Sequence, residues 1–195
     1  MSREKVAKTI SNIFNPYYLS APFFLFVAIT TTDNLMMALA YWLVSAVFFS
    51  FLPVWDIGRR VSKGLVTDPH INRREDRIRP FLFSLFCAVA GLVAVYLIGA
   101  PVEMRAISWS VVIMGVLITL ITIFWKVSLH AAGITATAFI LTVLYGLVAL
   151  PVVVCVPVVF WARYVLNKHT PAQLGVGSVI AVTVSAGVFW YFGLL

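Results

Sequence analysis

The sequence predicts an all-α integral membrane protein, with six to seven transmembrane helices in a bundle. The 195 residues are 62% hydrophobic and 11% charged, whereas a soluble domain carries about 25% charged residues. The mean hydropathy is +1.02, so the chain has more apolar surface than a soluble core could bury. The apolar residues form long continuous runs and do not alternate with polar ones, which favours transmembrane helices over a β-barrel.

The apolar residues fall into seven runs, at about 17–32, 35–55, 80–99, 106–124, 131–149, 151–166 and 174–194. The first run is short and follows Asn15-Pro16, so it is compatible with a tilted, interfacial or re-entrant segment as well as a span. Only Leu150-Pro151 separates the fifth run from the sixth, which predicts a tight turn there.

We interpret residues 1–195 as one membrane domain, with a basic N-terminal segment at 1–15 and a polar cytoplasmic loop at 56–80. The N-terminus lacks the compact apolar core and small-residue cleavage site of a signal peptide, so the first run is expected to be retained. Cys87 and Cys155 both lie within apolar runs, where cysteine usually serves as a small buried hydrophobic residue.

The basic residues indicate how the chain is oriented. If every run spans, the N-terminus and the segments at 56–79, 125–130 and 163–170 share one face. That face holds thirteen of the fourteen Lys and Arg residues, namely Arg3, Lys5, Lys8, Arg59, Arg60, Lys63, Arg73, Arg74, Arg77, Arg79, Lys126, Arg163 and Lys168. Only Arg105 lies on the other face. Cytoplasmic loops carry the excess of Lys and Arg, so the basic face is predicted to be cytoplasmic.

Three polar clusters lie next to spans on this face, at 72–80, 125–130 and 163–173. Two spans separate each cluster from the next, so the chain returns to the same side each time. Ionisable groups beside or within a membrane are costly and usually functional. The topology therefore predicts one shared site.

The residue types in these clusters suit phosphate chemistry without a metal or another cofactor. Arg and Lys bind phosphate oxygens, and Arg can do so with two parallel hydrogen bonds. Ser128 adds a hydroxyl donor. The two histidines of the clusters, His130 and His169, supply the two roles that hydrolysis of a phosphomonoester needs, a nucleophile and a general acid.

The clusters also carry a family resemblance, which covers about residues 72 to 190. Arg163, five residues, His169, three residues and Gln173 resemble the third motif of the type 2 phosphatidic acid phosphatase family. The segment Lys126-Val-Ser-Leu-His130 is similar to the family's second motif, Pro-Ser-Gly-His, and Arg79-Pro80 resembles the end of its first motif. The resemblance implies a phosphatidic-acid-phosphatase-like fold.

The resemblance also implies a role for each matching residue. His169 matches the nucleophile and His130 the general acid. Arg163, Ser128 and Arg79 match phosphate-binding positions, and Lys126 and Arg73 can add positive charge beside them. No metal is implied.

The chain departs from the family pattern at several positions. Asn72 stands where the first motif has its leading lysine, and Val127 and Leu129 replace the proline and glycine of the second motif. Gln173 replaces the final aspartate, whose charge stabilises the positive nucleophilic histidine. In serine proteases the analogous Asp→Asn change costs about 10⁴ in rate. Catalysis here would be slow, would use another acid, or would be lost. Candidate replacement acids are Asp68, Glu75 and Asp76.

Three functions compete on these observations. The leading one is a membrane-embedded phosphatase that hydrolyses a lipid phosphate or polyprenyl (di)phosphate through a phosphohistidine, with membrane lipids and not nucleic acid as its partners. The alternative is a catalytically weakened protein that binds or transports lipid phosphates on the same scaffold. An aromatic prenyltransferase is disfavoured, because it needs paired aspartate motifs that hold Mg²⁺.

Simpler interpretations stand beside these roles. Arg73 to Arg79 suit an anchor for anionic lipid headgroups, and Lys168 suits a side chain that snorkels to the interface. His70 is expected to be a loop residue, and Asp56 and Arg59 a local helix pair.

Overall fold

The computed structural model describes residues 2–66, 71 and 73–195, and these residues contain helices but no strand. The expected all-α class is confirmed. The described chain divides into two compact units. The first unit contains the residues up to Leu19 together with Lys126–Leu195, and the second contains Ser20–Trp125.

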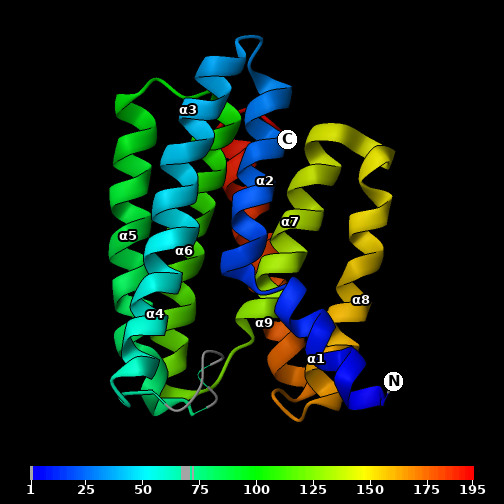
Figure 1. Ribbon diagram of the computed structural model, residues 1–195. Coiled ribbons are helices and arrows are strands. Elements are labelled where there is room, and N and C mark those ends of the chain that lie inside the picture. Colours follow the sequence, from blue (N-terminus) through cyan, green and yellow to red (C-terminus); the bar gives the residue numbers. More distant parts are fainter. Residues whose placement is uncertain (1, 67–70, 72) are drawn as a thin grey trace. The chain divides into compact units, whose positions relative to one another are not determined.

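The second unit consists of most of α2 and the helical elements that follow it (Figure 1). Their bounds are α2 Pro16–Thr31, α3 Leu35–Ala46, η1 Val47–Phe51, α4 Leu52–Ser62, η2 Glu75–Arg77, α5 Ile78–Leu97 and α6 Val102–Phe124. The α5 helix packs against α6 on one side and against α3 and α4 on the other.

The π-helical turn η1 joins α3 to α4 without breaking the helical segment. Proline has no N–H, so Pro53 cannot donate to the carbonyl of Phe49 four residues earlier. The Ser20 hydroxyl donates to that carbonyl instead, at 3.0 Å. Gly91 of α5 lies against this turn, and a Cβ built there would lie 2.7 Å from the Cβ of Phe48. A small residue at this position lets two apolar helices pack closely.

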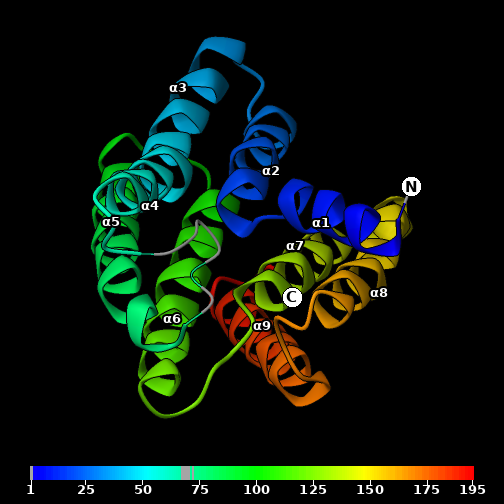
Figure 2. The same ribbon diagram turned by 60° about the horizontal axis from the view of Figure 1, so that its bottom comes forward.

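The first unit is built around a helical hairpin. Its elements are α1 Arg3–Ile13, α7 Leu129–Tyr145, η3 Gly146–Ala149, α8 Leu150–Val165 and α9 Pro171–Tyr191. The chain reverses after α7 at Gly146, whose φ of +62° favours glycine. The α8 helix therefore runs back along α7 (Figure 1), α9 packs on α7, and α1 lies against α8 (Figure 2).

By length and composition, five helical segments are able to cross a membrane, or six if the bent pair α1 and α2 counts as one span. They include Leu35–Ser62 and Leu129–Val165, the second of which holds both arms of the hairpin. Each of the seven apolar runs coincides with helix. The expected count of six to seven overlaps this range at six. The segment Leu129–Val165 is counted once, although α7 and α8 within it run in opposite directions.

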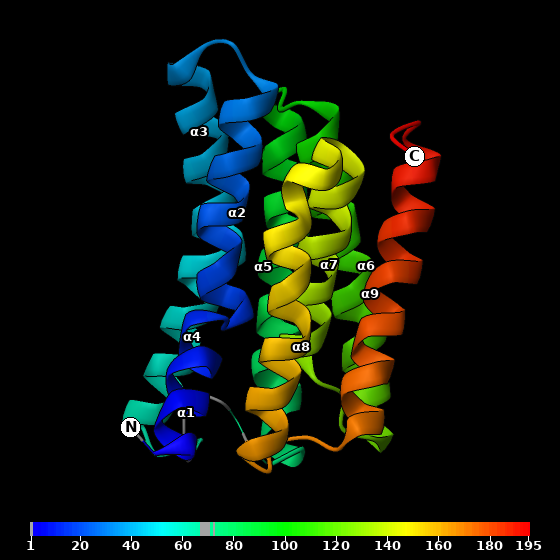
Figure 3. The same ribbon diagram turned by 90° about the vertical axis from the view of Figure 1, so that its right-hand side faces the viewer.

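The exposed surface of these helices is apolar, as expected for contact with lipid. In α5, Phe86 and Leu97 are 70% and 82% exposed, while the buried side carries small residues such as Cys87 and Ala88. Packing in lipid relies on such small residues because apolar tails offer no hydrophobic gain between helices. Cys87 is buried, as expected, and Cys155 is half-buried. Figure 3 shows that α7 and α8 of the first unit run roughly along one direction, whereas α1 lies obliquely to them.

The contact between α9 and the start of α7 gives a testable prediction. A Cβ at Gly177 would lie 2.7 Å from the carbonyl oxygen of Ser128, so Gly177→Ala must displace backbone. We expect it to lower the free energy of unfolding by about 1–3 kcal/mol, measured by thermal or denaturant unfolding in detergent. Gly175→Ala and Gly187→Ala are controls in the same helix, because nothing lies within 4 Å of a Cβ at either position. Equal stability of Gly177→Ala and Gly175→Ala would contradict the close contact.

Candidate active site

The end of α8 sets the spacing between Arg163 and His169. Asn167 has a φ of +51°, a conformation that asparagine tolerates better than most residues. Its N–H donates to the Tyr164 carbonyl at 2.9 Å, and the Lys168 N–H donates to the Arg163 carbonyl at 3.1 Å. These two bonds form a Schellman motif. This motif ends α8 abruptly. His169 therefore directly follows Lys168, whose N–H is bonded to the last turn of α8.

The start of α9 fixes the ring of His169. Thr170 caps the helix, and its hydroxyl accepts from the Gln173 N–H at 3.3 Å. In return, Gln173 Oε1 accepts from the Thr170 N–H at 3.3 Å and lies 3.1 Å from His169 Nδ1. An amide oxygen can only accept, so Nδ1 carries the proton. In the neutral ring the lone pair is then on Nε2.

The segment from Lys126 to His130 is tied to the same turn. The Ser128 N–H donates to the Gln173 carbonyl at 3.2 Å, and Lys126 Nζ donates to the Lys168 carbonyl at 2.8 Å. Ser128 is fully buried and caps α7, because its hydroxyl oxygen accepts from the Ala131 N–H at 3.3 Å. That arrangement leaves the hydroxyl hydrogen able to donate to another group.

Helix α1 contributes a residue that the sequence analysis did not select, Ser11. Arg163 Nη1 donates to Ser11 Oγ at 2.6 Å. His130 Nε2 lies 3.0 Å from the Ser11 carbonyl, and a carbonyl can only accept, so Nε2 carries the proton. The signal in the sequence was weak: Ala7 and Ser11, four residues apart, are small residues on one face of a basic helix, and both are buried.

The structure therefore brings six of the eight residues selected from the sequence to one end of the first unit. These are Lys126, Ser128, His130, Arg163, His169 and Gln173. Arg163 is 1% exposed, His169 6% and His130 7%. Burying a charged guanidinium is expensive unless polar groups or opposite charges surround it, so a buried arginine beside two buried histidines suggests a site for an anion.

The acidic residues support this interpretation. The last acidic residue of the chain is Glu103, so residues 104–195 contain no Asp or Glu. Any negative charge that balances the cations of α7, α8 and α9 must come from an earlier part of the chain or from a ligand. The lack of acidic residues after Glu103 is visible in the sequence. It indicates an anion site more clearly than the motifs alone.

The other two selected residues, Arg73 and Arg79, lie in the second unit, where both are exposed. Their participation in the site stays a prediction. In the same segment, Arg74 Nη1 donates to the Phe124 carbonyl at 2.6 Å, and the buried Arg77 donates through Nε to the Ile71 carbonyl at 2.8 Å.

Two of the possible replacement acids, Glu75 and Asp76, lie in the second unit. Glu75 lies 3.6 Å from Arg74 in the second unit, and Asp76 follows it there. Asp68, His70 and Asn72, which the sequence analysis also considered, lie outside the described residues. Among the residues that the structure describes, no group of three or more His, Cys, Asp or Glu side chains could hold a metal ion.

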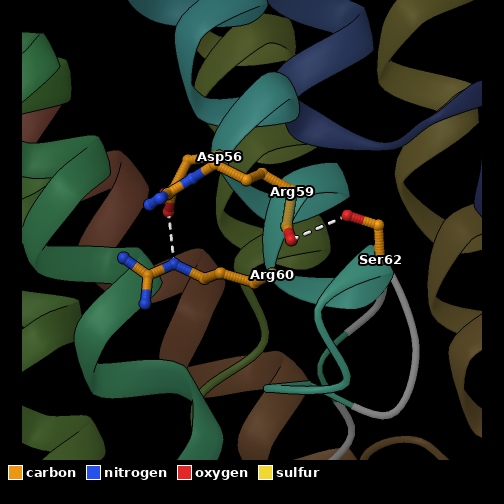
Figure 4. Close-up of polar contacts among 4 residues, drawn as sticks. All are labelled: Asp56, Arg59, Arg60 and Ser62. Carbon is orange, nitrogen blue, oxygen red and sulfur yellow. Dashed lines mark hydrogen bonds and ion pairs between the residues drawn. The ribbon is translucent and has the colours of Figure 1, made fainter.

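Asp56 forms a second buried polar centre, near the end of α4 (Figure 4). Its carboxylate pairs with Arg59 at 2.9 Å, as the sequence predicted, and also with Arg60. The Ser62 hydroxyl donates to the Arg59 carbonyl at 2.9 Å. Asp56 is 1% exposed, and its charge is met by two neighbours on its own helix. These contacts fit a structural helix end better than a site.

Comparisons of the chain with protein-family models, with curated proteins and with solved structures find no match. The class of protein is therefore defined by the fold and the site. It is an all-helical protein whose apolar helices are long enough to cross a membrane and whose first unit carries a buried centre of arginine and histidine.

The Schellman motif at the end of α8 can be tested by replacing Asn167. Asn167→Ala places a less tolerant residue at positive φ, so we expect the free energy of unfolding to fall by about 1 kcal/mol. Asn167→Gly should be neutral or slightly stabilising, because glycine adopts this conformation readily. Denaturant unfolding of both variants in detergent measures the difference. If Asn167→Gly is as destabilised as Asn167→Ala, backbone conformation is not what the position requires.

Proposed function

We propose that the protein is a membrane-embedded phosphatase that acts on a lipid phosphate or a polyprenyl (di)phosphate through a phosphohistidine on His169. One observation carries the proposal. His169, oriented by Gln173, lies in the same cluster of buried basic residues as His130 and Arg163, at one end of the apolar helices α7, α8 and α9. A phosphate headgroup matches the cluster, and a lipid tail matches the helices.

In the proposed first step, His169 Nε2 attacks phosphorus while its Nδ1–H stays bonded to Gln173 Oε1. A P–N bond forms and the P–O bond to the leaving alcohol breaks. His130 donates a proton to the leaving oxygen. Because His130 Nε2 is held on the Ser11 carbonyl, Nδ1 is the atom that would transfer this proton.

In the second step, water attacks the phosphohistidine and His130 takes up a proton from the water. The P–N bond breaks, which releases inorganic phosphate and restores both histidines. Arg163, Lys126 and the Ser128 hydroxyl would stabilise the negative charge of the phosphoryl oxygens in both steps. No bound metal is needed for this charge stabilisation.

The uncharged partner of His169 limits the expected rate. Gln173 fixes the tautomer and orientation of the ring, but it adds no negative charge when the phosphohistidine makes the ring positive. His130 is likewise held by a neutral group, the Ser11 carbonyl. We therefore expect turnover that is slow compared with a site in which a carboxylate holds the nucleophile.

The same observations favour a second candidate, a protein that binds or transports lipid phosphates without hydrolysing them. Gln173 and the altered second motif, with Val127 and Leu129, weaken catalysis more than they weaken binding. Arg163 and Lys126 would still attract the headgroup in such a protein.

Purified protein distinguishes the two candidates. It is incubated in EDTA with phosphatidic acid and with a polyprenyl diphosphate in mixed micelles, and phosphate release is measured. We expect release by the wild-type protein and a fall of about 10³-fold or more in His169→Asn, which keeps a polar side chain but lacks the nucleophilic ring nitrogen. Tyr164→Phe, a change at an exposed position beside the site, is the control. Tight binding without turnover would establish the second candidate, and equal turnover by wild type and His169→Asn would exclude the phosphatase.

We further propose that this site faces the cytoplasm, because the basic residues concentrate at the site end of the hairpin. In a variant without Cys87 and Cys155, single cysteines at Asn12 and at Leu147 mark the two ends of the first unit. Both positions are exposed. A membrane-impermeant maleimide should label Asn12→Cys only after cells are permeabilised, and Leu147→Cys in intact cells. Labelling of Asn12→Cys in intact cells would overturn the orientation.

A further inference from the structure

We propose that Ser11 of α1 is a positioning residue of the phosphate site, because it holds Arg163 with its hydroxyl oxygen and His130 with its carbonyl. The proposal rests on the proposed function and adds an element to the site. In this proposal, helix α1 is part of the functional site and not only a basic segment that sets the orientation of the chain in the membrane.

The contacts of Ser11 differ from those of other buried serines in the chain. Ser45, Ser108 and Ser110 are each buried, and each donates to the carbonyl four residues earlier in its own helix. This is the usual way for a serine to satisfy its hydroxyl inside an apolar helix. Ser11 instead accepts a hydrogen bond from Arg163, a residue 152 positions away on another helix. The Ser11 side chain therefore provides a hydrogen-bond acceptor for the guanidinium of Arg163.

To act on a phosphate, Arg163 and His130 must each be held in a defined orientation. An arginine side chain has many rotamers, and fixing one of them costs about 2 kcal/mol of side-chain entropy. A hydrogen bond from Nη1 to Ser11 Oγ restricts those rotamers before the headgroup arrives. The Ser11 carbonyl fixes the proton of His130 on Nε2, as second partners of functional histidines commonly do.

The docking of α1 is also supported away from Ser11. The guanidinium of Arg3, near the other end of α1, lies 5.9 Å from the ring centre of Trp161 on α8. Such a cation–π contact adds roughly 0.5–1 kcal/mol at an exposed site. Ala7, one turn before Ser11, is fully buried, so the helix approaches α8 closely along this face.

The alternative role for Ser11 is a plug, in which α1 occupies the place of the headgroup and must move away before substrate binds. The two roles make opposite predictions. Loss of the Ser11 hydroxyl weakens phosphate binding if Ser11 positions Arg163, and strengthens binding if Ser11 competes with phosphate for Arg163.

The test measures the dissociation constant of inorganic phosphate by isothermal titration, together with kcat and KM for phosphatidic acid. We expect Ser11→Ala to weaken phosphate binding about tenfold, as for the loss of one hydrogen bond to a charged group. Ser11→Thr keeps the hydroxyl and should restore most of the affinity. Thr9→Ala, an exposed hydroxyl on the same helix, should have no effect.

A double-mutant cycle separates positioning from general destabilisation. In an Arg163→Lys background, Ser11→Ala should cause little further loss, because the group it positions is gone. Equal losses in both backgrounds, tighter phosphate binding by Ser11→Ala, or unchanged binding would each overturn the proposal. Thermal unfolding of every variant shows whether it is folded.

The binding measurement does not depend on turnover, so the two proposals can fail separately. A wild-type protein that binds phosphate but does not hydrolyse phosphatidic acid removes the phosphatase, while the comparison of Ser11→Ala with Ser11→Thr still decides the role of Ser11. A wild-type protein that neither binds phosphate nor hydrolyses phosphatidic acid removes both.

Discussion

The first turn of α9 is the constraint on which the arrangement of the site depends, and Gln173 is its central residue. The side-chain oxygen of Gln173 completes the helix cap with Thr170 and fixes the His169 ring, while its main-chain oxygen accepts from the Ser128 N–H. One turn further on, Gly177 leaves room for the Ser128 carbonyl. The turns that begin α7 and α9 therefore share one set of hydrogen bonds, so a change in either alters the position of His169.

The electrostatics of this arrangement are unusual for apolar surroundings. Arg163, His130 and His169 are buried, yet the 92 residues after Glu103 carry no carboxylate. Their neighbours include neutral oxygens, namely Ser11 Oγ, the Ser11 carbonyl and Gln173 Oε1, which orient these side chains. In the proposed function, such aligned groups would favour a dianionic phosphate. The neutral amide of Gln173 is the reason that slow turnover is expected when His169 becomes positively charged.

The sequence was sufficient to predict the helices and the gathering of several selected residues at one end of the first unit. Long apolar runs predicted the all-helical fold, and the even number of runs between clusters predicted that Ser128, His130, Arg163 and His169 would lie at one end. The sequence predicts a tight turn at Leu150-Pro151, whereas the chain reverses earlier, at Gly146, where a positive φ is required. The count of spans was not fixed by the sequence, since hydropathy does not distinguish a turn within a helical segment from a break between two helices.

Ser11 could not be predicted, for a physical reason. Its contacts with Arg163 and His130 join residues more than 100 positions apart, and one of them uses a main-chain carbonyl that every residue possesses. The basic residues around Ser11 are typical of a segment that sets orientation in the membrane. Arg73 and Arg79 present the opposite case, because their cluster is visible in the sequence but both residues lie in the second unit.

The central claim is that His169 carries the phosphoryl group, and trapping that intermediate tests it most directly. Protein in detergent is mixed with ³²P-labelled phosphatidic acid, quenched in alkali after single-turnover times, and digested for peptide mapping. The account predicts a label that is stable to alkali, labile to acid, located on His169 and absent in His169→Asn. Turnover of the lipid without any labelled protein, or with the label on another residue, would contradict it.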